Sequence, residues 1–362
     1  MELIMKMIYQ KLSLTIVLAI ACCNNAALAM ENKVNISSAK NRIKVLMNHL
    51  NSSENKDNNQ IVSKNCSEIS NTVENSDDPW RYFTNFEYDA DPGRHYNWLL
   101  DKNVKLTEKW NPDMIVAMHG YEGYPYSFHQ EADFFWKHKL YMLNCNPHGS
   151  LVWNNESEKT KYTALGQEYD ALVILAGLLV CNDKGIKKVY GLGESRGGAA
   201  WITALAMLSD PYTYESWWKR LCVVKNDALD IEKINSTKKM VQNGIVYLGY
   251  PLLDMEFVLN LIDKIIPGGK KEFLSKSIKF SADRPSPHVL LKALVEKNEF
   301  NIVMDLAKDE TVVGDTYNKM FKSMENEKFK VLTNQSRLHG DREKMVEGAL
   351  KVYLKDLETN KN

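Results

Sequence analysis

Residues 188–200 read KVYGLGESRGGAA, and this stretch decides the fold. Its first half is predicted to be a short buried strand, and its second half a helix that opens on small residues. Between them lies a sharp turn with the pattern G-x-S-x-G, formed by Gly193, Ser195 and Gly197. Strand and helix crowd together at such a turn, which holds the serine in strained backbone with its hydroxyl over the sheet edge. The pattern therefore predicts an active-site nucleophile, Ser195, against the alternative of a plain glycine-rich turn.

Strand-like apolar runs alternate with helical stretches on both sides of this turn. Strands are predicted at residues 81–89, 95–100, 114–118, 140–145, 244–249, 300–306 and 329–333. Helices are predicted at residues 132–139, 162–181, 196–209, 315–326 and 342–357. A helical region is predicted at 251–299, with breaks at 267–269 and 285–287. A further helical insertion is predicted around Trp217 and Trp218. This alternation implies right-handed βαβ crossovers, and hence an α/β fold with a mostly parallel sheet covered on both faces.

The first 29 residues have the features of an export signal. Lys6 and Lys11 precede an apolar run at residues 12–21, and residues 27–29 (Ala-Leu-Ala) offer a small-x-small cleavage site. The run is shorter than the roughly 20 residues that a membrane span needs, so no stable span is expected. An alternative is bacterial lipidation of Cys22, which lies in a lipobox-like context. We expect an exported protein, secreted or periplasmic.

Residues 30–79 contain no aromatic residue and are dense in Asn, Ser, Lys and Glu. Such a segment buries too little apolar surface to offset its ordering entropy, so it is predicted to be mostly flexible, with a short helix at residues 43–50. The folded domain is predicted to begin at Trp80 and to extend to residue 362.

The charge composition and the spacing of histidine and glycine residues argue against nucleic-acid, metal and phosphate-cofactor binding. The chain has 46 basic and 46 acidic residues, so no electrostatic footprint for nucleic acid is present. The spacing of His129, His138 and His148 matches no recurring metal site, and no phosphate-binding glycine loop occurs, so neither metal nor cofactor is expected. After signal removal four cysteines would remain, and in an exported chain they permit disulfides: Cys66, Cys145, Cys181 and Cys222. Six N-x-S/T sequons matter only in a eukaryotic secretory pathway.

Three features occur together in this chain: the serine turn, the His119-Gly120 loop after the strand 114–118, and later acidic and histidine residues in the order Ser…Asp…His. In these features the chain resembles an α/β-hydrolase over residues 81–357. The resemblance implies a serine nucleophile, a histidine general base and a carboxylate that orients the imidazole. It does not fix the substrate, because this fold carries many chemistries.

The resemblance places the base and the acid after the nucleophile in the chain. Of the two later histidines, His288 lies in the helical region before any acid loop, whereas His339 follows the last predicted strand and is the expected base. Asp309, in the loop after the penultimate strand, is the expected acid. Its rival is Asp254, shortly after the strand that follows the nucleophile, with Asp305 and Asp315 as further alternatives; each of them is otherwise an ordinary solvated carboxylate.

An oxyanion hole needs two backbone N–H groups aimed at the developing negative oxygen. Arg196, directly after the nucleophile, is expected to supply one and Tyr121 the other, with Gly120 allowing close approach of the backbone. The alternative for His119-Gly120 is a simple strand-ending turn. The side chains of Tyr121, Tyr124 and Tyr126 are expected to line the pocket, unless they serve packing alone.

We therefore expect an exported serine hydrolase that cleaves a small-molecule or lipid-like ester, or else a thioester or amide, through an acyl-enzyme on Ser195. The alternatives are a serine peptidase of the same fold and a non-catalytic binding protein related to these enzymes. The helical region at 251–299 is expected to form a cap that sets substrate size above the carboxyl edge of the sheet. Its apolar residues predict either a lid for an acyl group or ordinary helix packing: Phe257, Val258, Leu259, Leu261, Ile262, Ile265 and Ile266.

Overall fold

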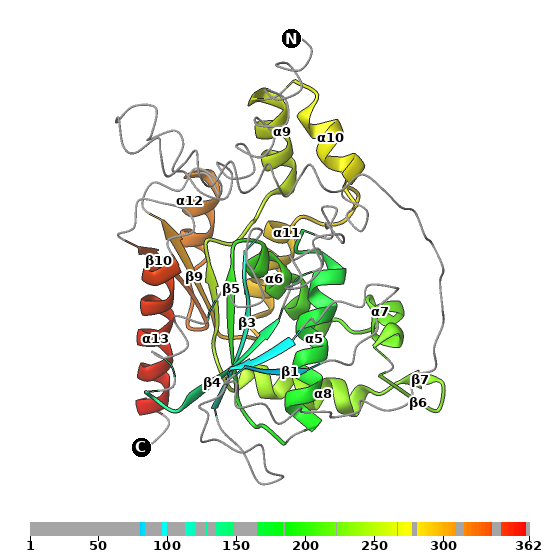
Figure 1. Ribbon diagram of the computed structural model, residues 1–362, viewed down its shortest axis with the longest axis vertical. Coiled ribbons are helices and arrows are strands. Elements are labelled where there is room, and N and C mark those ends of the chain that lie inside the picture. Colours follow the sequence, from blue (N-terminus) through cyan, green and yellow to red (C-terminus); the bar gives the residue numbers. More distant parts are fainter. Residues whose placement is uncertain are drawn as a thin grey trace.

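A twisted sheet runs through the middle of the protein and carries helices on both faces (Figure 1). The computed structural model describes residues 80–83, 96–99, 113–120, 128, 135, 137–145, 147, 165–183, 185–221, 223–265, 267–276, 281–307, 315–334 and 342–359. The expected export signal and the polar segment, residues 1–79, lie outside these ranges, as do residues 360–362.

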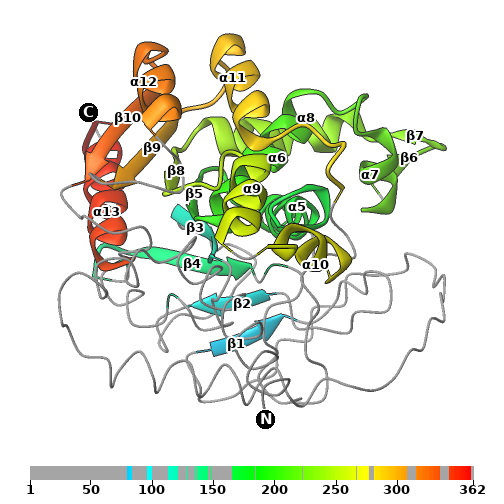
Figure 2. The ribbon, with the colours of Figure 1, turned by 90° about the horizontal axis from the view of Figure 1, so that it is seen from above.

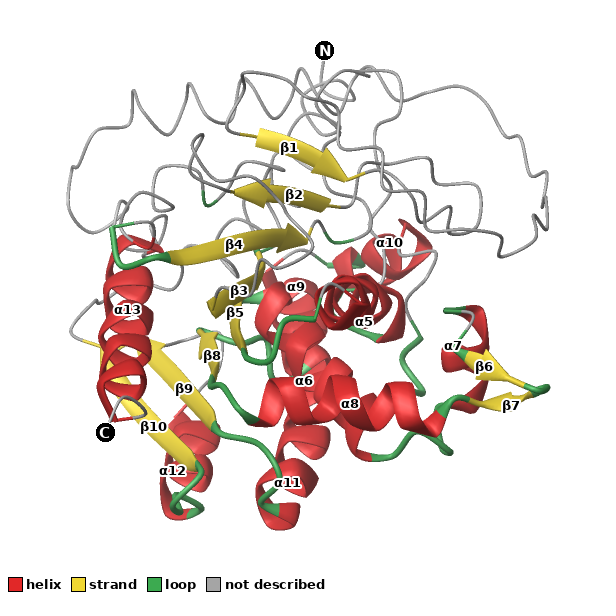
Figure 3. Ribbon diagram, turned by 90° about the horizontal axis from the view of Figure 1, so that it is seen from below, coloured by secondary structure: helices red, strands yellow, loops and turns green. Residues whose placement is uncertain are grey.

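Within the described residues the sheet has eight strands in the order β1-β2-β4-β3-β5-β8-β9-β10 (Figure 3). Their bounds are β1 Trp80–Phe83, β2 Tyr96–Leu99, β3 Asp113–Met118, β4 Leu140–Cys145, β5 Val189–Glu194, β8 Val246–Gly249, β9 Ile302–Ala307 and β10 Phe329–Asn334. Strand β2 is antiparallel to both of its neighbours, and every other pair in the sheet is parallel. The prediction of a mostly parallel sheet is confirmed.

The helices are divided unequally between the two faces (Figure 2). Among the helices in the described ranges, α13, Arg342–Thr359, packs on one face, together with Phe128 and Phe135. The other face carries α5, Glu168–Asp183; α6, Arg196–Ser209; α8, Ile231–Gln242; α11, Pro287–Lys297; and α12, Asp315–Ser323. A short helix, α7 (Glu215–Arg220), and a small hairpin, β6 (Val224–Lys225) with β7 (Ala228–Leu229), project from the edge of this helical layer.

Strand β3 shows why its sequence is a continuous apolar run. Successive side chains of a strand point to opposite faces. Met114, Val116 and Met118 pack in the cluster beneath the larger helical layer. Ile115 and Ala117 pack in the cluster beneath α13. Because helices cover both faces, apolar residues are required at every position rather than at alternate ones.

Helix α5 begins at Glu168 rather than at Tyr162, where the sequence predicts it. Leu165 (φ 49°) and Gly166 (φ 88°) both have left-handed backbone and form a turn instead of helix. The N–H of Gly166 donates to the Asp170 carboxylate at 2.7 Å. The later start follows from this local turn, which an apolar periodicity does not reveal.

The helical region at 251–299 consists of α9, Met255–Ile265; α10, Gly269–Lys276; and α11. The predicted breaks are confirmed: Pro267 and Gly268 separate α9 from α10, and Pro287 opens α11. Helix α11 packs on α6 through Leu291, Leu294 and Val295 and so belongs to the main core. Helices α9 and α10 pack on each other and lie at the top of Figure 1.

Two of the cysteines that could have formed disulfides are buried free thiols in the structure. Cys145 ends β4 and Cys181 lies in the last turns of α5. Burial raises the pKa of each thiol well above its ordinary value, so both stay protonated and unreactive at neutral pH. Cys66 and Cys222 lie outside the described residues. None of the described helices combines the length and apolar character needed to cross a bilayer.

Candidate active site

Ser195 occupies a strained turn between β5 and α6. Its backbone angles, φ 50° and ψ −108°, belong to a region that non-glycine residues enter at a cost of about 1–3 kcal/mol. The turn is held by the N–H of Ser195, which donates to the Gly249 carbonyl at 2.8 Å, and by the N–H of Leu252, which donates to the Ser195 carbonyl at 3.0 Å. Although Ser195 stands at the N-cap of α6, its side chain makes no capping hydrogen bond. The backbone around the serine is therefore held at two points by one neighbouring segment, residues 249–252, and the hydroxyl does not fold back onto the helix.

The two glycines of the pattern are required by different contacts. A Cβ at Gly193 would lie 2.7 Å from the carbonyl oxygen of Gly197, which is the expected crowding of strand and helix. A Cβ at Gly197 would lie 2.6 Å from the carbonyl carbon of Met118 and would overlap its oxygen. Gly197 therefore faces the end of β3, and its smallness lets α6 start directly against that neighbouring strand.

We predict that Gly197→Ala destabilises the fold by about 3 kcal/mol and lowers the yield of folded protein, because the obstructing atoms are backbone and cannot move aside. Denaturant unfolding measures the effect. Gly185→Ala is the control: its Cβ would meet nothing within 4 Å, and only the positive φ of 79° is unfavourable, costing about 1 kcal/mol. Equal losses in the two variants would contradict the close approach at Met118.

The loop after β3 lies beside the serine. A Cβ on Gly120 would be 3.4 Å from the Ser195 Cβ, so the backbone of this loop reaches Ser195. The N–H of Gly120 donates to Glu194 Oε2 at 3.2 Å. Since that N–H already has an acceptor, Gly120 itself is not available as an oxyanion donor. Tyr121, the expected donor, lies outside the described residues, as do Tyr124 and Tyr126.

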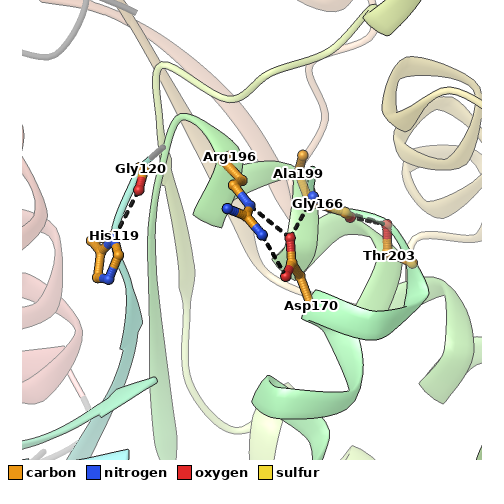
Figure 4. A network of polar contacts seen from close by, with 7 residues as sticks. All are labelled: His119, Gly120, Gly166, Asp170, Arg196, Ala199 and Thr203. Carbon is orange, nitrogen blue, oxygen red and sulfur yellow. Dashed lines mark hydrogen bonds and ion pairs between the residues drawn. The ribbon is translucent and has the colours of Figure 1, made fainter. Parts of the chain in front are cut away.

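His119 is fully buried next to this loop (Figure 4). Its Nδ1 lies 2.7 Å from the Gly120 carbonyl oxygen, and since a carbonyl can only accept, Nδ1 carries the proton. Burial lowers the pKa of His119 to about 4, with the charge of Arg342 acting in the same direction, so the ring is neutral at neutral pH. Nε2 has no hydrogen-bond partner among the described residues. The ring therefore holds the loop backbone as a neutral donor.

Because the pKa of His119 is lower in the folded state than the 6.5 of an unfolded chain, the unfolded state binds the extra proton as the pH falls. The stability is complete above about pH 6.5 and declines toward pH 4. One pKa unit corresponds to about 1.4 kcal/mol, so we predict a loss of about 3 kcal/mol over this range. Urea unfolding between pH 7 and pH 4 measures it.

His119→Asn should flatten this pH dependence, since the asparagine amide can still donate to the Gly120 carbonyl but does not titrate. His288→Asn, at a half-buried histidine on α11, controls for the loss of a histidine as such. A slope that is the same in wild type and His119→Asn would show that His119 does not cause it.

Arg196 follows the serine and is almost fully buried, with a side chain that turns away toward α5 (Figure 4). Its Nε and Nη2 donate to the two carboxylate oxygens of Asp170 at 2.8 Å and 2.9 Å. Thr203 Oγ1 donates to the Gly166 carbonyl, so the turn before α5 is tied to α6 as well. Breaking such a buried pair by removing one partner costs about 3–5 kcal/mol. The Arg196 side chain thus fixes α5 against α6, and only its backbone N–H, at the start of α6, is suited to serve an oxyanion.

Two of the rival acids are engaged elsewhere, and the third, Asp315, is the first residue of α12. Asp254 Oδ1 accepts from the N–H of Phe257 at 3.0 Å at the start of α9, and Oδ2 accepts from the Tyr317 hydroxyl. Burial and this carboxylate raise the pKa of Tyr317 to about 12. Asp305 is buried in β9 and accepts from the Tyr247 hydroxyl. The expected acid and base, Asp309 and His339, lie outside the described residues.

Two groups of site residues were not predicted from the sequence. The carboxylate of Asp170, which pairs with Arg196, is one of them. The other is the ion pair between Glu194 and Arg342, whose Nη2 lies 2.6 Å from Glu194 Oε2. The only signal in the sequence was the presence of Glu194 and Arg196, two charged residues inside a stretch that had to be buried; such charges need partners, but their identity could not be predicted.

The strand order, the antiparallel second strand and the serine turn after β5 together define the architecture. The chain has the α/β-hydrolase fold. In this fold the nucleophile lies at the carboxyl edge of the central strand, where Ser195 is found. The expected resemblance is therefore confirmed at the level of the fold.

No protein-family model matches the chain, and no curated protein matches it. Among solved structures it is similar to esterase B from Lactobacillus rhamnosis, with 12% identity, a TM-score of 0.45, and coverage of 77% of this chain and 85% of that one. An esterase from Pyrococcus furiosus has 11% identity and a TM-score of 0.44, over 72% of this chain and 86% of that one. A puromycin-hydrolyzing peptidase from Mycobacterium tuberculosis has 15% identity and a TM-score of 0.43, over 72% of this chain but 37% of that one. These likenesses are distant, and the fold is assigned from the strand order and the serine turn.

Proposed function

We propose that the protein is a serine hydrolase that cleaves an ester through an acyl-enzyme on Ser195. The observation that carries this proposal is the strained turn that sets Ser195 at the start of α6 and beside the loop at Gly120. Other residues, such as Leu165, also have positive φ, but at Ser195 the strain coincides with the serine of the G-x-S-x-G pattern and with the close approach of Gly120, and strained backbone clusters at active sites.

In the proposed reaction the Ser195 hydroxyl attacks the ester carbonyl while His339 takes the hydroxyl proton. The negative charge that develops on the carbonyl oxygen is stabilised by the N–H groups of Arg196 and Tyr121. Collapse of this intermediate expels the alcohol, which leaves with the proton from His339. Water, deprotonated by His339, then hydrolyses the acyl-enzyme to the acid and restores the serine.

Topology supports Asp309 and His339 as acid and base. Strands β9 and β10 are parallel neighbours, and their last residues, Ala307 and Asn334, are paired in register. The segments 308–314 and 335–341 therefore start from the same edge of the sheet as the serine turn. Arg342 contacts Glu194 beside Ser195, and His339 is three positions earlier; three peptide steps span at most about 11 Å.

A lid role for α9 is also proposed. Val258 and Leu259 are buried, whereas Phe257 on the same helix is exposed. The segment leaves the sheet beside the serine turn, since Leu252 donates to the Ser195 carbonyl. The acyl chain of an acyl-enzyme on Ser195 that extends in this direction would contact apolar side chains of α9. We therefore propose an ester with an apolar acyl chain as the substrate. We further propose export by the N-terminal signal.

Ser195→Ala should abolish both hydrolysis of p-nitrophenyl esters and labelling by a fluorophosphonate probe, with an unchanged melting temperature. Loss of the nucleophile in such a site costs on the order of a million-fold in turnover. Short-chain and long-chain esters are compared, and peptide amides in the same assay separate an esterase from a peptidase. A variant that retains a tenth of the wild-type rate would rule out the mechanism, and a wild type that the probe does not label would indicate a non-catalytic protein.

The triad acid is distinguished by isosteric amides. Asp309→Asn should lower kcat at least about a hundredfold, because the amide favours the wrong tautomer of the base, an effect that reaches about ten-thousand-fold in a well-studied protease. Asp254→Asn is the matched comparison: it weakens the start of α9 and the bond to Tyr317, so it should lower the melting temperature and change kcat less than about tenfold. The reverse ranking of the two kcat values would assign the acid to Asp254.

A further inference from the structure

Glu194 connects three segments that are distant in the sequence. It is the last residue of β5, directly before Ser195, and it is 5% exposed. Its Oε2 accepts from the N–H of Gly120 in the loop after β3, at 3.2 Å. The same oxygen accepts from Nε and Nη2 of Arg342, the first residue of α13, at 3.0 Å and 2.6 Å. One carboxylate oxygen thus receives donors from both segments that flank the serine turn.

The charge on this carboxylate is maintained in spite of its burial. Burial alone raises the pKa of Glu194, but the charge of Arg342 and the hydrogen bonds from Arg342 and Gly120 outweigh burial and hold the pKa below its ordinary value. Charge-assisted hydrogen bonds of this kind are roughly twice as strong as neutral ones. The Arg342 guanidinium is itself confined, since it lies 5.3 Å from the centre of the buried Phe128 ring. Arg342 is therefore held by the Phe128 ring as well as by the Glu194 carboxylate.

The position of the link matters because each end adjoins a residue of the proposed mechanism. Gly120 is held twice, by Glu194 at its N–H and by His119 at its carbonyl. A peptide unit is planar, so a held carbonyl also restricts the direction of the N–H that follows it. At the other end, Arg342 directly follows the segment 335–341, which contains His339.

We propose that Glu194 is a positioning residue that sets the oxyanion loop and the base-bearing segment relative to Ser195. This inference rests on the proposed serine hydrolase. Glu194 touches neither substrate nor reacting atoms; it acts through Gly120 and Arg342. A shift of about 1 Å in catalytic groups can cost on the order of a hundredfold in rate, so loss of the link should affect turnover more than substrate binding.

The test measures kcat and KM for a p-nitrophenyl ester, with the concentration of reactive serine in each preparation determined by complete fluorophosphonate labelling. Glu194→Gln keeps an oxygen acceptor and loses the charge, whereas Glu194→Leu loses both. We expect kcat per reactive serine to fall about tenfold in Glu194→Gln and about a hundredfold in Glu194→Leu, with KM within about threefold of wild type. Arg342→Lys should retain more kcat than Arg342→Met.

The double variant Glu194→Leu/Arg342→Met should be no slower than the slower of its single variants, because both remove the same link. Glu299→Gln is the control for loss of a paired carboxylate: Glu299 contacts Lys238 and Ser209 away from the serine turn, so this change should lower the melting temperature alone. If the Glu194 variants lose melting temperature but keep kcat per reactive serine, the link is merely structural and the inference is wrong. A wild-type protein that is not labelled would instead overturn the proposed function itself.

Discussion

The serine turn depends on one close approach of backbone to backbone. Helix α6 begins so near the end of β3 that Gly197 lies against the Met118 carbonyl group. This contact brings the loop after β3 to Ser195. Glu194 and Arg196, on either side of the serine, are therefore buried together with it. Buried charges are costly unless paired, so each requires an opposite charge from another element.

Those partners connect the turn to both helical layers. Asp170 of α5 pairs with Arg196 on one side of the sheet, and Arg342 of α13 pairs with Glu194 on the other. The close packing at Gly197 thus buries two charged side chains, and each of them needs an oppositely charged partner. The serine is held not only by its own strained backbone but also by two ion pairs that connect it to the helices packed on opposite faces.

The sequence was sufficient to predict most of the fold. β4 has the predicted bounds, Leu140–Cys145, because its apolar run stands between two clear breaks. The beginning of α5 was not predicted, because the left-handed turn at Leu165 and Gly166 is stabilised by Asp170 and Thr203, and apolar periodicity carries no information on such contacts. Strand order was not predictable either, because it follows from how crossovers pack. In the candidate site, the sequence predicted the sharp turn at Ser195 and the loop at Gly120, and the structure places the two side by side; their catalytic roles stay a prediction. It did not predict the ion pairs, because Asp170 lies 26 and Arg342 lies 148 positions from its partner.

The buried pair of Arg196 and Asp170 has a consequence for altering this protein. Position 196 adjoins Ser195, the proposed nucleophile, and would be an obvious choice in a library meant to change substrate preference. Its side chain, however, lies in the interior between α5 and α6, where it pairs with Asp170. Most single replacements there would leave the Asp170 carboxylate buried without its counter-charge, whereas an apolar pair at both positions can be tolerated. Positions 170 and 196 therefore have to be varied together, because a substitution at either position alone changes the stability of the fold rather than the substrate preference.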